Sequence, residues 1–285
     1  MKLIALREMI GDYGRVREGD IFDVDDVSAR RLIQRGLAKP WRPVQSSEPP
    51  REIQAFIRAP EEKNQPPSTS SSRPLVSCIM PTADRPRFVP GAVRNFLEQT
   101  YEPKELIVID DGKIPAEIPT HPSIRAIRIR TGDARRTIGE KRNLAIREYA
   151  RGEIIAHWDD DDRYAPDRLE SQVMALNAAH VATGYRDIDF IDERGSRFRM
   201  TGTVDYAAGT SLCYWREWAL AHPFPATNVS EDNAFLKEAA GRVLVLPGQE
   251  RVVARIHRDN TVKKRPGGQG WTRLPKKELP RWANI

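Results

Sequence analysis

The stretch VSCIMPTADRPRFVPGAVRNFLEQTYEPKELIVIDDG, residues 76–112, contains two strand-like runs with a helical pattern between them. The runs VSCIM and ELIVID are short and almost entirely apolar, which is typical of strands that are covered on both faces of a parallel sheet. Between them, Val93, Phe96 and Leu97 have the i, i+3, i+4 spacing of an amphipathic helix. This order of strand, helix and strand predicts an α/β fold.

The same alternation continues along the chain. The apolar run EIIAHW, residues 153–158, predicts a third strand, and it follows a helical pattern that includes Ala145, Ile146 and Tyr149. A further helix is expected from Pro166, because proline is favoured in the first helical turn. We therefore expect a doubly wound, mixed and mostly parallel sheet flanked by helices. In such a sheet, ligands bind beyond the carboxyl ends of the strands.

The amino-terminal part of the chain differs in composition from this domain. Residues 1–43 predict a small separate α+β module, with two short strands and a helix from about Val27, and the module resembles small modules encoded in tailed phages and prophages. Residues 44–74 are rich in Pro, Ser and Glu and cannot build a core, so we expect a linker there.

The α/β domain is expected to span residues 75–261, with one half at 75–165 and the other at 166–261. Residues 262–285 then form a basic tail. This tail holds seven Lys or Arg against one Glu, so it carries the whole formal net charge of +6. It is either a solvated basic segment or a lip that binds a polyanion or a product.

Several classes of protein are disfavoured by the sequence. No apolar run approaches the roughly 20 residues that a membrane-spanning helix needs, and Arg7 and Glu8 interrupt the stretch that would form the core of a signal peptide. We therefore expect no membrane span and a cytoplasmic protein, in the host cytoplasm if a phage encodes it. Cys78 and Cys213 lack the spacing of zinc ligands, so a metal site here would consist of oxygen ligands and histidine. The oligomeric state is not indicated.

Four consecutive aspartates, Asp159 to Asp162, follow the third predicted strand. Neighbouring carboxylates repel one another, so such a run is tolerated where it is fully solvated or where a cation lies among the acids. Asp159 and Asp161 have the D-x-D spacing that is suited to a hard divalent cation bridging to a substrate diphosphate. On this stretch alone, a solvated acidic turn is an equally open interpretation.

The stretch 76–112, together with GEKRNLAIREYARGEIIAHWDDDDRYAPDRL at residues 139–169, resembles the nucleotide-binding half of inverting family 2 glycosyltransferases with the GT-A fold. The resemblance runs in order over about residues 75–260. It implies a GT-A, Rossmann-like sheet in which residues 75–165 bind the nucleotide and residues 166–261 bind the acceptor.

The resemblance also implies roles for individual residues. In that family, the turn after the first strand touches the nucleobase and the later acid after the second strand holds the uracil imide. The D-x-D motif binds ribose or phosphate through its first Asp and the metal through its last, and the connection before the third strand faces the nucleotide. The matching positions here are Pro81, Thr82, Asp111, Asp159, Asp160 and Asp161, with Arg136, Arg142 and Asn143 in the connection. Taken singly, most of these residues could be structural.

In the second half, NVSEDNAFLKEAAG at residues 228–241 predicts a helix with Ser230 as its N-cap. A helix dipole alone would select acids in this first turn. The resemblance implies instead that the second acid, Asp232, is the general base that removes the acceptor proton. His257 lies near the end of a later predicted strand, and the resemblance implies a late metal or diphosphate ligand there, although a structural histidine is as plausible.

The expected function is transfer of a sugar from a nucleoside diphosphate sugar, most simply a UDP-sugar, to an acceptor hydroxyl with inversion of configuration. The cofactor would be Mn²⁺ or Mg²⁺, and histidine beside carboxylates favours Mn²⁺. The acceptor would be a saccharide or, if the phage-like module and the basic tail are meaningful, a polyanion such as hydroxymethylated bases in phage DNA. Two other functions remain open: a metal-dependent nucleotidyltransferase, and a non-catalytic module that binds nucleotide sugars or nucleic acid.

Overall fold

The computed structural model divides the chain into two compact units, Met1–Pro66 and Pro67–Ile285. It describes residues 2–5, 9–11, 14–16, 21–23, 26–35, 37–40, 73–129, 135–275 and 281–283. The linker predicted at 44–74 lies almost entirely outside the described residues.

The smaller unit has the α+β character expected from the sequence. A three-stranded antiparallel sheet has the order β4-β1-β5, and β2 pairs with β3. The elements are β1 (Lys2–Ala5), β2 (Met9–Gly11), β3 (Gly14–Val16), β4 (Ile21–Asp23), α1 (Asp26–Gln34) and β5 (Ala38–Pro40). The sequence suggested two strands where the structure has five, because strands of three or four residues are too short to show an alternating pattern.

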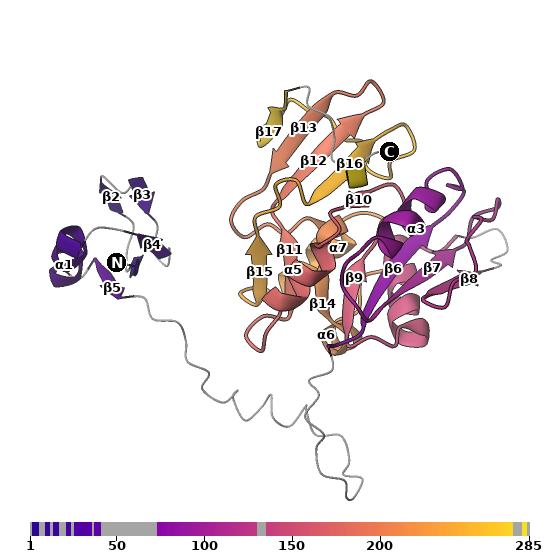
Figure 1. Cartoon of the computed structure of the whole chain (residues 1–285), viewed down its shortest axis with the longest axis horizontal. Coiled ribbons are helices and arrows are strands. Elements are labelled where there is room, and N and C mark those ends of the chain that lie inside the picture. Colours follow the sequence, from indigo (N-terminus) through magenta and orange to yellow (C-terminus); the bar gives the residue numbers. More distant parts are fainter. Residues whose placement is uncertain are drawn as a thin grey trace, which may run out of the picture. The chain divides into compact units, whose positions relative to one another are not determined.

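The larger unit is built around a seven-stranded sheet with the order β15-β11-β14-β9-β6-β7-β8 (Figure 1). Among these strands, β14 alone runs antiparallel to its neighbours. The strands are β6 (Val76–Thr82), β7 (Lys104–Asp110), β8 (Ile124–Arg128), β9 (Ile154–His157), β11 (Ala182–Tyr185), β14 (Cys213–Trp215) and β15 (Val243–Leu246). The mixed, mostly parallel sheet predicted from the sequence is confirmed.

Helices cover both faces of this sheet. Successive side chains of a strand point to opposite faces, so Cys78 and Met80 belong to one buried cluster and Ile79 to another. The first cluster includes residues of α3 (Val89–Leu97) and α5 (Arg168–Ala175). The second includes residues of α6 (Arg216–Ala221), α7 (Glu231–Glu238) and the π-helix Ala145–Tyr149, which continues α4 (Ile138–Leu144).

A second sheet of five strands has the order β10-β16-β12-β13-β17. Its strands are β10 (Arg163–Tyr164), β12 (Asp187–Asp192), β13 (Arg197–Thr201), β16 (Val252–Ile256) and β17 (Trp271–Arg273). The β12–β13 hairpin turns at residues 193–195. Because β17 pairs with β13, part of the basic segment after residue 262 belongs to this sheet.

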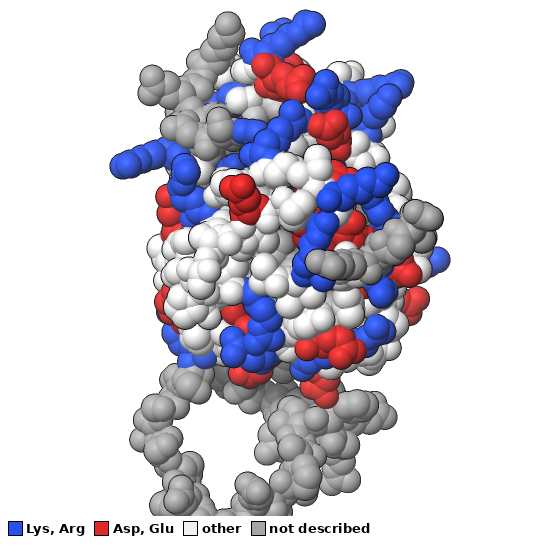
Figure 2. Space-filling view, turned by 90° about the vertical axis from the view of Figure 1, so that its right-hand side faces the viewer, with Lys and Arg blue, Asp and Glu red and all other residues white. Residues whose placement is uncertain are grey.

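Two surface properties bear on possible partners. On the face shown in Figure 2, Lys and Arg side chains are interspersed with Asp and Glu. Within the described residues, the longest apolar helical stretch falls short of what crossing a bilayer requires.

Candidate functional site

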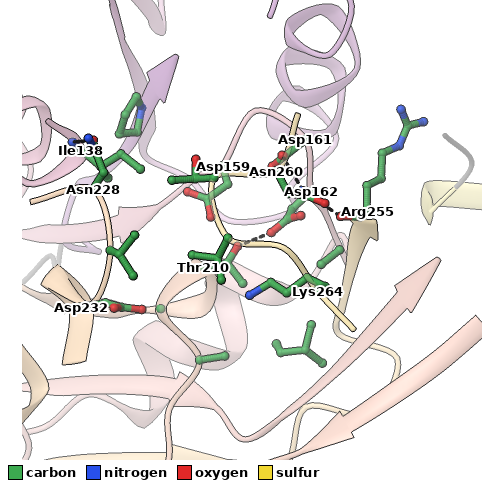
Figure 3. A pocket seen from close by; sticks show the side chains of 18 of the residues that line it. Ile138, Asp159, Asp161, Asp162, Thr210, Asn228, Asp232, Arg255, Asn260 and Lys264 are labelled. Carbon is green, nitrogen blue, oxygen red and sulfur yellow. Dashed lines mark hydrogen bonds between the residues drawn. The ribbon is translucent and has the colours of Figure 1, made fainter. Parts of the chain in front are cut away.

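A cavity of about 230 Å³ lies where the carboxyl ends of β6 and β9 meet the five-stranded sheet and the first turn of α7 (Figure 3). One side of it is the acidic wall, Asp159 to Asp162, which directly follows β9. Another side is the apolar floor, formed by strand residues of the second sheet: Ile188, Phe190, Met200 and Ala254. Residues of the segment after β16 and of α7 complete the lining.

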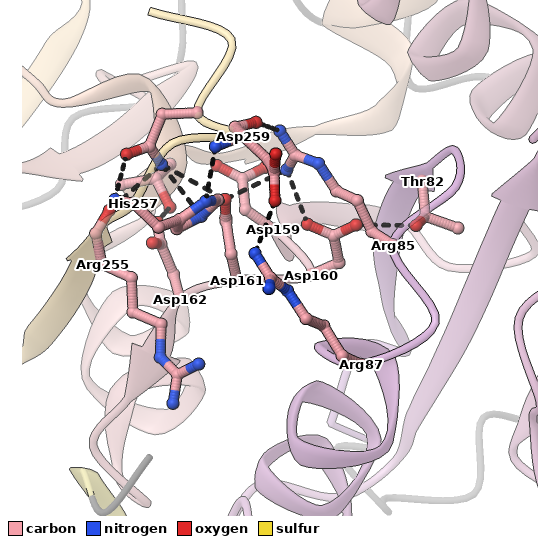
Figure 4. Close-up of polar contacts among 12 residues, drawn as sticks. Thr82, Arg85, Arg87, Asp159, Asp160, Asp161, Asp162, Arg255, His257 and Asp259 are labelled. Carbon is pink, nitrogen blue, oxygen red and sulfur yellow. Dashed lines mark hydrogen bonds and ion pairs between the residues drawn. The ribbon is translucent and has the colours of Figure 1, made fainter. Parts of the chain in front are cut away.

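Arg85, in the loop after β6, joins two acids of the acidic wall (Figure 4). Its Nη1 donates to Asp160 Oδ1 and to Asp161 Oδ2, at 3.0 Å in each case. Thr82 Oγ1 donates to the other oxygen of Asp160 at 2.6 Å. Thr82, which the resemblance associates with the nucleobase, therefore also holds the aspartate between Asp159 and Asp161 of the D-x-D motif.

The other two acids have separate partners. Asp159 Oδ1 lies 3.6 Å from Arg142 Nη2, which is a loose ion pair. Asp162 Oδ2 accepts a hydrogen bond from Thr210 Oγ1 at 2.6 Å. Among the described residues, Asp162 has no cationic side chain within ion-pair distance, although it is buried. The repulsion within the acidic wall is therefore only partly offset by the protein.

This incomplete neutralisation appears in the pKa values of the acids. Burial, followed by the charge of Asp161, raises the pKa of Asp160 to about 6. Burial and the charges of Asp161 and Asp159 raise the pKa of Asp162 well above its ordinary value. Burial acts the same way on Asp161, but hydrogen bonding to His257 and the charge of Arg85 outweigh it and lower the pKa of Asp161. Asp161 is therefore the acid most firmly held in its ionised form.

Asp161 and His257 have donor atoms that suit a small divalent cation. Asp161 Oδ2 and His257 Nε2 are 3.0 Å apart, and Asn260 Nδ2 is 3.5 Å from the same carboxylate oxygen. Two ligands at about 2.1 Å from one ion and at a right angle to each other are about 3.0 Å apart, so the Asp161–His257 pair fits such an ion. The described part of the chain contains no group of three or more His, Cys, Asp or Glu side chains placed to hold a metal. Substrate phosphates would have to complete the coordination.

The first turn of α7 places two neighbouring acids in different surroundings. Glu231 is buried and forms an ion pair with Arg142. Asp232 lines the cavity and has no ion-pair partner among the described residues. A Cβ on Gly209 would stand 1.7 Å from Asp232 Oδ2, so the missing side chain at Gly209 makes room for this carboxylate. Ser230 is at the N-cap position of α7, as predicted, but it has a φ of 64° and its side chain makes no capping hydrogen bond.

Six of the residues named from the sequence line the cavity: Pro81, Arg142, Asp159, Asp160, Asp161 and Asp232. Thr82 and His257 are not part of the lining, and each is hydrogen-bonded to one aspartate of the acidic wall. Asp111, Arg136 and Asn143 are not part of the lining.

Two of these three residues, Asp111 and Asn143, make polar contacts with other parts of the protein instead. Asp111 is buried, forms an ion pair with Lys141 and accepts a hydrogen bond from the backbone N–H of Arg136 at 2.8 Å. The side-chain amide of Asn143 donates to the carbonyl of Phe224 at 2.7 Å and accepts from its N–H at 2.9 Å. Asn143 thus joins α4 to the segment before α7, and the side chain of Arg136 is exposed.

The polar residues of the lining that the sequence reasoning did not select include Arg85, Thr210, Asn260 and Lys264. Arg85 and Asn260 were detectable in principle, because each lies within four residues of a position that was selected. Thr210 had no sequence signal, since it belongs to a short 3₁₀ turn, Gly209–Ser211, that only the folded chain brings to the acidic wall. Lys264 points into the cavity from the segment that the sequence treated as a tail (Figure 3).

Curated relatives of this chain are glycosyltransferases by name. An uncharacterized glycosyltransferase of Haemophilus influenzae is 28% identical over 140 residues, which are 47% of this chain and 56% of that protein. The putative glycosyltransferase EpsE of Bacillus subtilis is 31% identical over 156 residues, 50% of this chain and 55% of that protein. The Escherichia coli UDP-Glc:alpha-D-GlcNAc-diphosphoundecaprenol beta-1,3-glucosyltransferase WfgD is 28% identical over 121 residues, 41% of this chain and 47% of that protein. This chain therefore spans about half the length of these relatives.

Among solved structures, the crystal structure of S. aureus TarS 1-349 in complex with UDP matches with a TM-score of 0.50 and 18% sequence identity, over 64% of this chain and 60% of that chain. At this identity the likeness concerns the fold. Residues 77–228, more than half of the 285 residues, match the family Glycosyl transferase family 2. The matched range contains the ends of β6, β7 and β9 and the acidic wall, and the chain belongs to glycosyl transferase family 2.

Proposed function

We propose that this protein transfers a hexosyl group from a UDP-sugar to an acceptor hydroxyl, with inversion of configuration and with dependence on Mn²⁺ or Mg²⁺. The observation that carries the proposal is that Asp232 and the acidic wall line one cavity, while Asp232 has no cationic partner among the described residues. An acid that holds a cation and an acid that accepts a proton are the two groups that such a displacement requires.

The donor nucleotide would occupy the side of the cavity at the ends of β6 and β7. Pro81 lines the cavity, and Thr82 is hydrogen-bonded to Asp160 beside it. Asp111 Oδ1 is buried and has no hydrogen-bond partner among the described residues, although Lys141 provides an opposite charge. This oxygen would accept the imide N–H of uracil through its second lone pair, although in this structure it contacts Lys141 Nζ and lies outside the cavity lining. Asp159 and Asp160 would contact the ribose or the phosphates.

The diphosphate would lie against Asp161 and His257, the two residues that would hold the metal. When bound, the ion would supply positive charge that stabilises the departing diphosphate. Arg85 and Lys264 line the same cavity and would add hydrogen bonds to the phosphate oxygens. Charge stabilisation of a leaving group by positioned cations is commonly the largest single contribution to such catalysis.

Asp232 would act as the general base. Its neighbour Glu231 is held by the buried Arg142, so the two acids at the start of α7 would have separate tasks. Glu231 fixes the helix start, and Asp232 removes the acceptor proton as the acceptor oxygen attacks the anomeric carbon. Attack from the side opposite the diphosphate inverts the configuration at that carbon.

A saccharide is the acceptor that we favour over a base in DNA. The relative WfgD is named for transfer from UDP-Glc to a GlcNAc-diphosphoundecaprenol acceptor. On the face shown in Figure 2, basic side chains alternate with acidic ones, whereas a DNA-binding surface is expected to present a continuous basic patch.

The test is a panel of nucleotide sugars, UDP-glucose, UDP-galactose, UDP-N-acetylglucosamine and GDP-mannose, incubated with Mn²⁺ and with neutral glycosides as acceptors. The expected result is release of UDP and formation of a glycoside whose anomeric configuration, read by NMR, is opposite to that of the donor. A reaction that consumes nucleoside triphosphates and is unaffected by Asp232→Asn would instead support a nucleotidyltransferase. Nucleotide-sugar binding with no turnover on any acceptor would support a binding module.

A further inference from the structure

We propose that the acceptor is an uncharged glycoside that places an apolar face on the apolar floor, and that anionic acceptors are excluded. The inference rests on the proposed function, because it assigns a chemical class to the substrate whose proton Asp232 removes. The supporting observations are the register of the five-stranded sheet, the position of Tyr206 and the charges that line the cavity.

The apolar floor follows from the alternation of side chains in β12. Ile188 is paired across the sheet with Met200, and Phe190 is paired with Ala254, so the four residues form two neighbouring pairs on one sheet face. The intervening residue Asp189 points to the opposite face, as expected for a strand. The sequence of β12 thus directs apolar side chains toward the cavity and Asp189 away from it. Because Ile188, Phe190 and Ala254 are only 1%, 4% and 6% exposed, the apolar surface open to a sugar is mainly that of Met200 and Tyr206, which are partly buried.

The apolar floor extends to the proposed base through Tyr206. The ring of Tyr206 packs over Gly202, where a Cβ would stand 2.2 Å from a ring carbon. Burial, and to a smaller extent the nearby charge of Asp232, raises the pKa of Tyr206, so its hydroxyl stays protonated at neutral pH. A pyranose ring whose hydroxyl reaches Asp232 would therefore lie beside Tyr206, with its C–H face on apolar side chains.

The charges of the cavity oppose an anionic acceptor. Six carboxylates and four basic side chains line it, although the whole chain has a formal net charge of +6. Arg85 and Arg142 are already paired with acids, and the guanidinium of Arg255 points away from the cavity (Figure 3). Lys264 then remains as the lining cation without an ion-pair partner among the described residues. The donor diphosphate would form an ion pair with it. An additional negative charge on the acceptor would lie close to Asp162, Glu231 and Asp232.

The experiment compares phenyl β-D-glucopyranoside with phenyl β-D-glucuronide, and the matching galactoside with the galacturonide, by isothermal titration of the full chain in the presence of UDP and Mn²⁺. Within each pair, only the group at C6 differs, a hydroxymethyl against a carboxylate. The expected result is that at least one neutral glycoside binds about tenfold more tightly than its uronide, as a single unfavourable charge contact would produce. Methyl glycosides, which lack the phenyl ring, should bind about threefold to tenfold more weakly than phenyl glycosides.

A variant series tests the apolar floor directly. Met200→Gln should weaken binding of the phenyl glycoside several-fold, whereas Met200→Leu should preserve it. The matched control is Met174→Gln, because Met174 is 78% exposed on α5 and lies outside the cavity lining. Saturation-transfer NMR should show the C–H protons of the sugar ring in contact with the wild type, and this contact should be weakened in Met200→Gln.

Three results would overturn the inference while leaving the proposed function intact. They are equal or tighter binding of the uronides, binding of a DNA duplex that contains 5-hydroxymethylcytosine in place of the glycosides, and binding of UDP with Mn²⁺ but of none of the glycosides. Failure of the wild type to bind UDP in Mn²⁺ would overturn the proposed function, and the inference with it.

Discussion

Buried acids at the two edges of the seven-stranded sheet behave in opposite ways. At the edge where the strands begin, Glu105 accepts hydrogen bonds from Ser77 Oγ at 2.7 Å and from Arg151, through its backbone N–H at 2.8 Å and its guanidinium at 2.7 and 2.9 Å. Burial raises the pKa of Glu105, but these hydrogen bonds outweigh burial and lower it. At the edge where the strands end, burial and like charges raise the pKa values of Asp160 and Asp162.

The difference separates acids whose charge the protein itself stabilises from acids whose charge it leaves poorly stabilised. Glu105 has all the partners that it needs within the protein, so it stabilises the native state in its ionised form. Asp160 and Asp162 are buried without enough positive charge, which destabilises the protein unless a ligand supplies the missing cation. Each of the following predictions tests one side of this contrast.

The largest expected effect is on catalysis at Asp232. Asp232→Asn keeps the size of the side chain but cannot accept the acceptor proton, so the transfer rate should fall by about 10²- to 10⁴-fold. UDP affinity, measured by titration calorimetry, should stay within about twofold of the wild type, since Asp232 is not expected to contact the nucleotide. The matched control Asp205→Asn changes an exposed acid and should leave the rate unchanged. A variant that retains more than a tenth of the rate would remove Asp232 from the reaction.

The next effect concerns the buried ion pair between Arg142 and Glu231, whose side chains are 5% and 7% exposed. Arg142→Met leaves Glu231 buried without its partner and should lower the free energy of unfolding by about 3 kcal/mol, as measured by urea denaturation. The double variant Arg142→Met/Glu231→Leu should recover most of that loss, because no uncompensated charge remains. A loss below about 1 kcal/mol in the single variant would mean that water already solvates Glu231.

A smaller effect is expected from the proposed metal ligand His257. His257→Gln should weaken UDP binding in Mn²⁺ by about 10- to 100-fold, and removal of the metal with EDTA should weaken binding to the wild type to a similar extent. His121→Gln is the control, since His121 is exposed and distant in sequence from the acidic wall. Equal UDP affinity of the wild type with and without EDTA would contradict the metal site.

The smallest effects are two changes of stability with opposite signs. Glu105→Gln should lower the free energy of unfolding at pH 7 by about 1.5 kcal/mol, because hydrogen bonds to a charged acceptor are lost. Since the folded pKa of Glu105 is depressed, its contribution is present above the unfolded pKa and is lost as the pH falls through the folded value. The difference between wild type and variant should therefore shrink below about pH 4.5.

Asp162→Asn should instead raise the stability at pH 7, by about 1 kcal/mol or more, while impairing activity. The folded pKa of Asp162 is raised, so the wild type is relatively stable below the unfolded pKa and loses that stability as the pH rises through the folded value. The advantage of the variant should therefore disappear near pH 4. Urea denaturation at several pH values measures both changes. If Glu105→Gln and Asp162→Asn changed the free energy of unfolding at pH 7 in the same direction, the contrast between the two edges of the sheet would be refuted.

The acidic side of the cavity could be predicted from the sequence because its determinants are local. Each apolar run marks a strand. Thr82 is the last residue of the first strand, and Asp111 and Asp159 lie just after the second and third, so the rule that ligands bind at the carboxyl ends of parallel strands places them at one edge. The role of Asp232 came from the resemblance alone, since a helix dipole would account equally well for the acids at the start of α7.

The apolar floor could not be predicted, because it depends on the pairing of strands that are far apart in the sequence. Ile188 and Phe190 are adjacent to Met200 and Ala254 only through the registers of β12 with β13 and β16. An alternating strand pattern shows that one face is apolar but not what that face meets. The entry of Lys264 into the cavity depends in the same way on the path of the chain after β16.

Gly209 begins the turn Gly209–Ser211. The Asp232 carboxylate fills the space that a methyl group at residue 209 would occupy. A larger residue at this position in a homologous sequence must displace the Asp232 side chain, the turn or the start of α7. The identity of residue 209 is therefore a simple marker for sorting homologues into those that keep this position of the Asp232 carboxylate and those that have changed it.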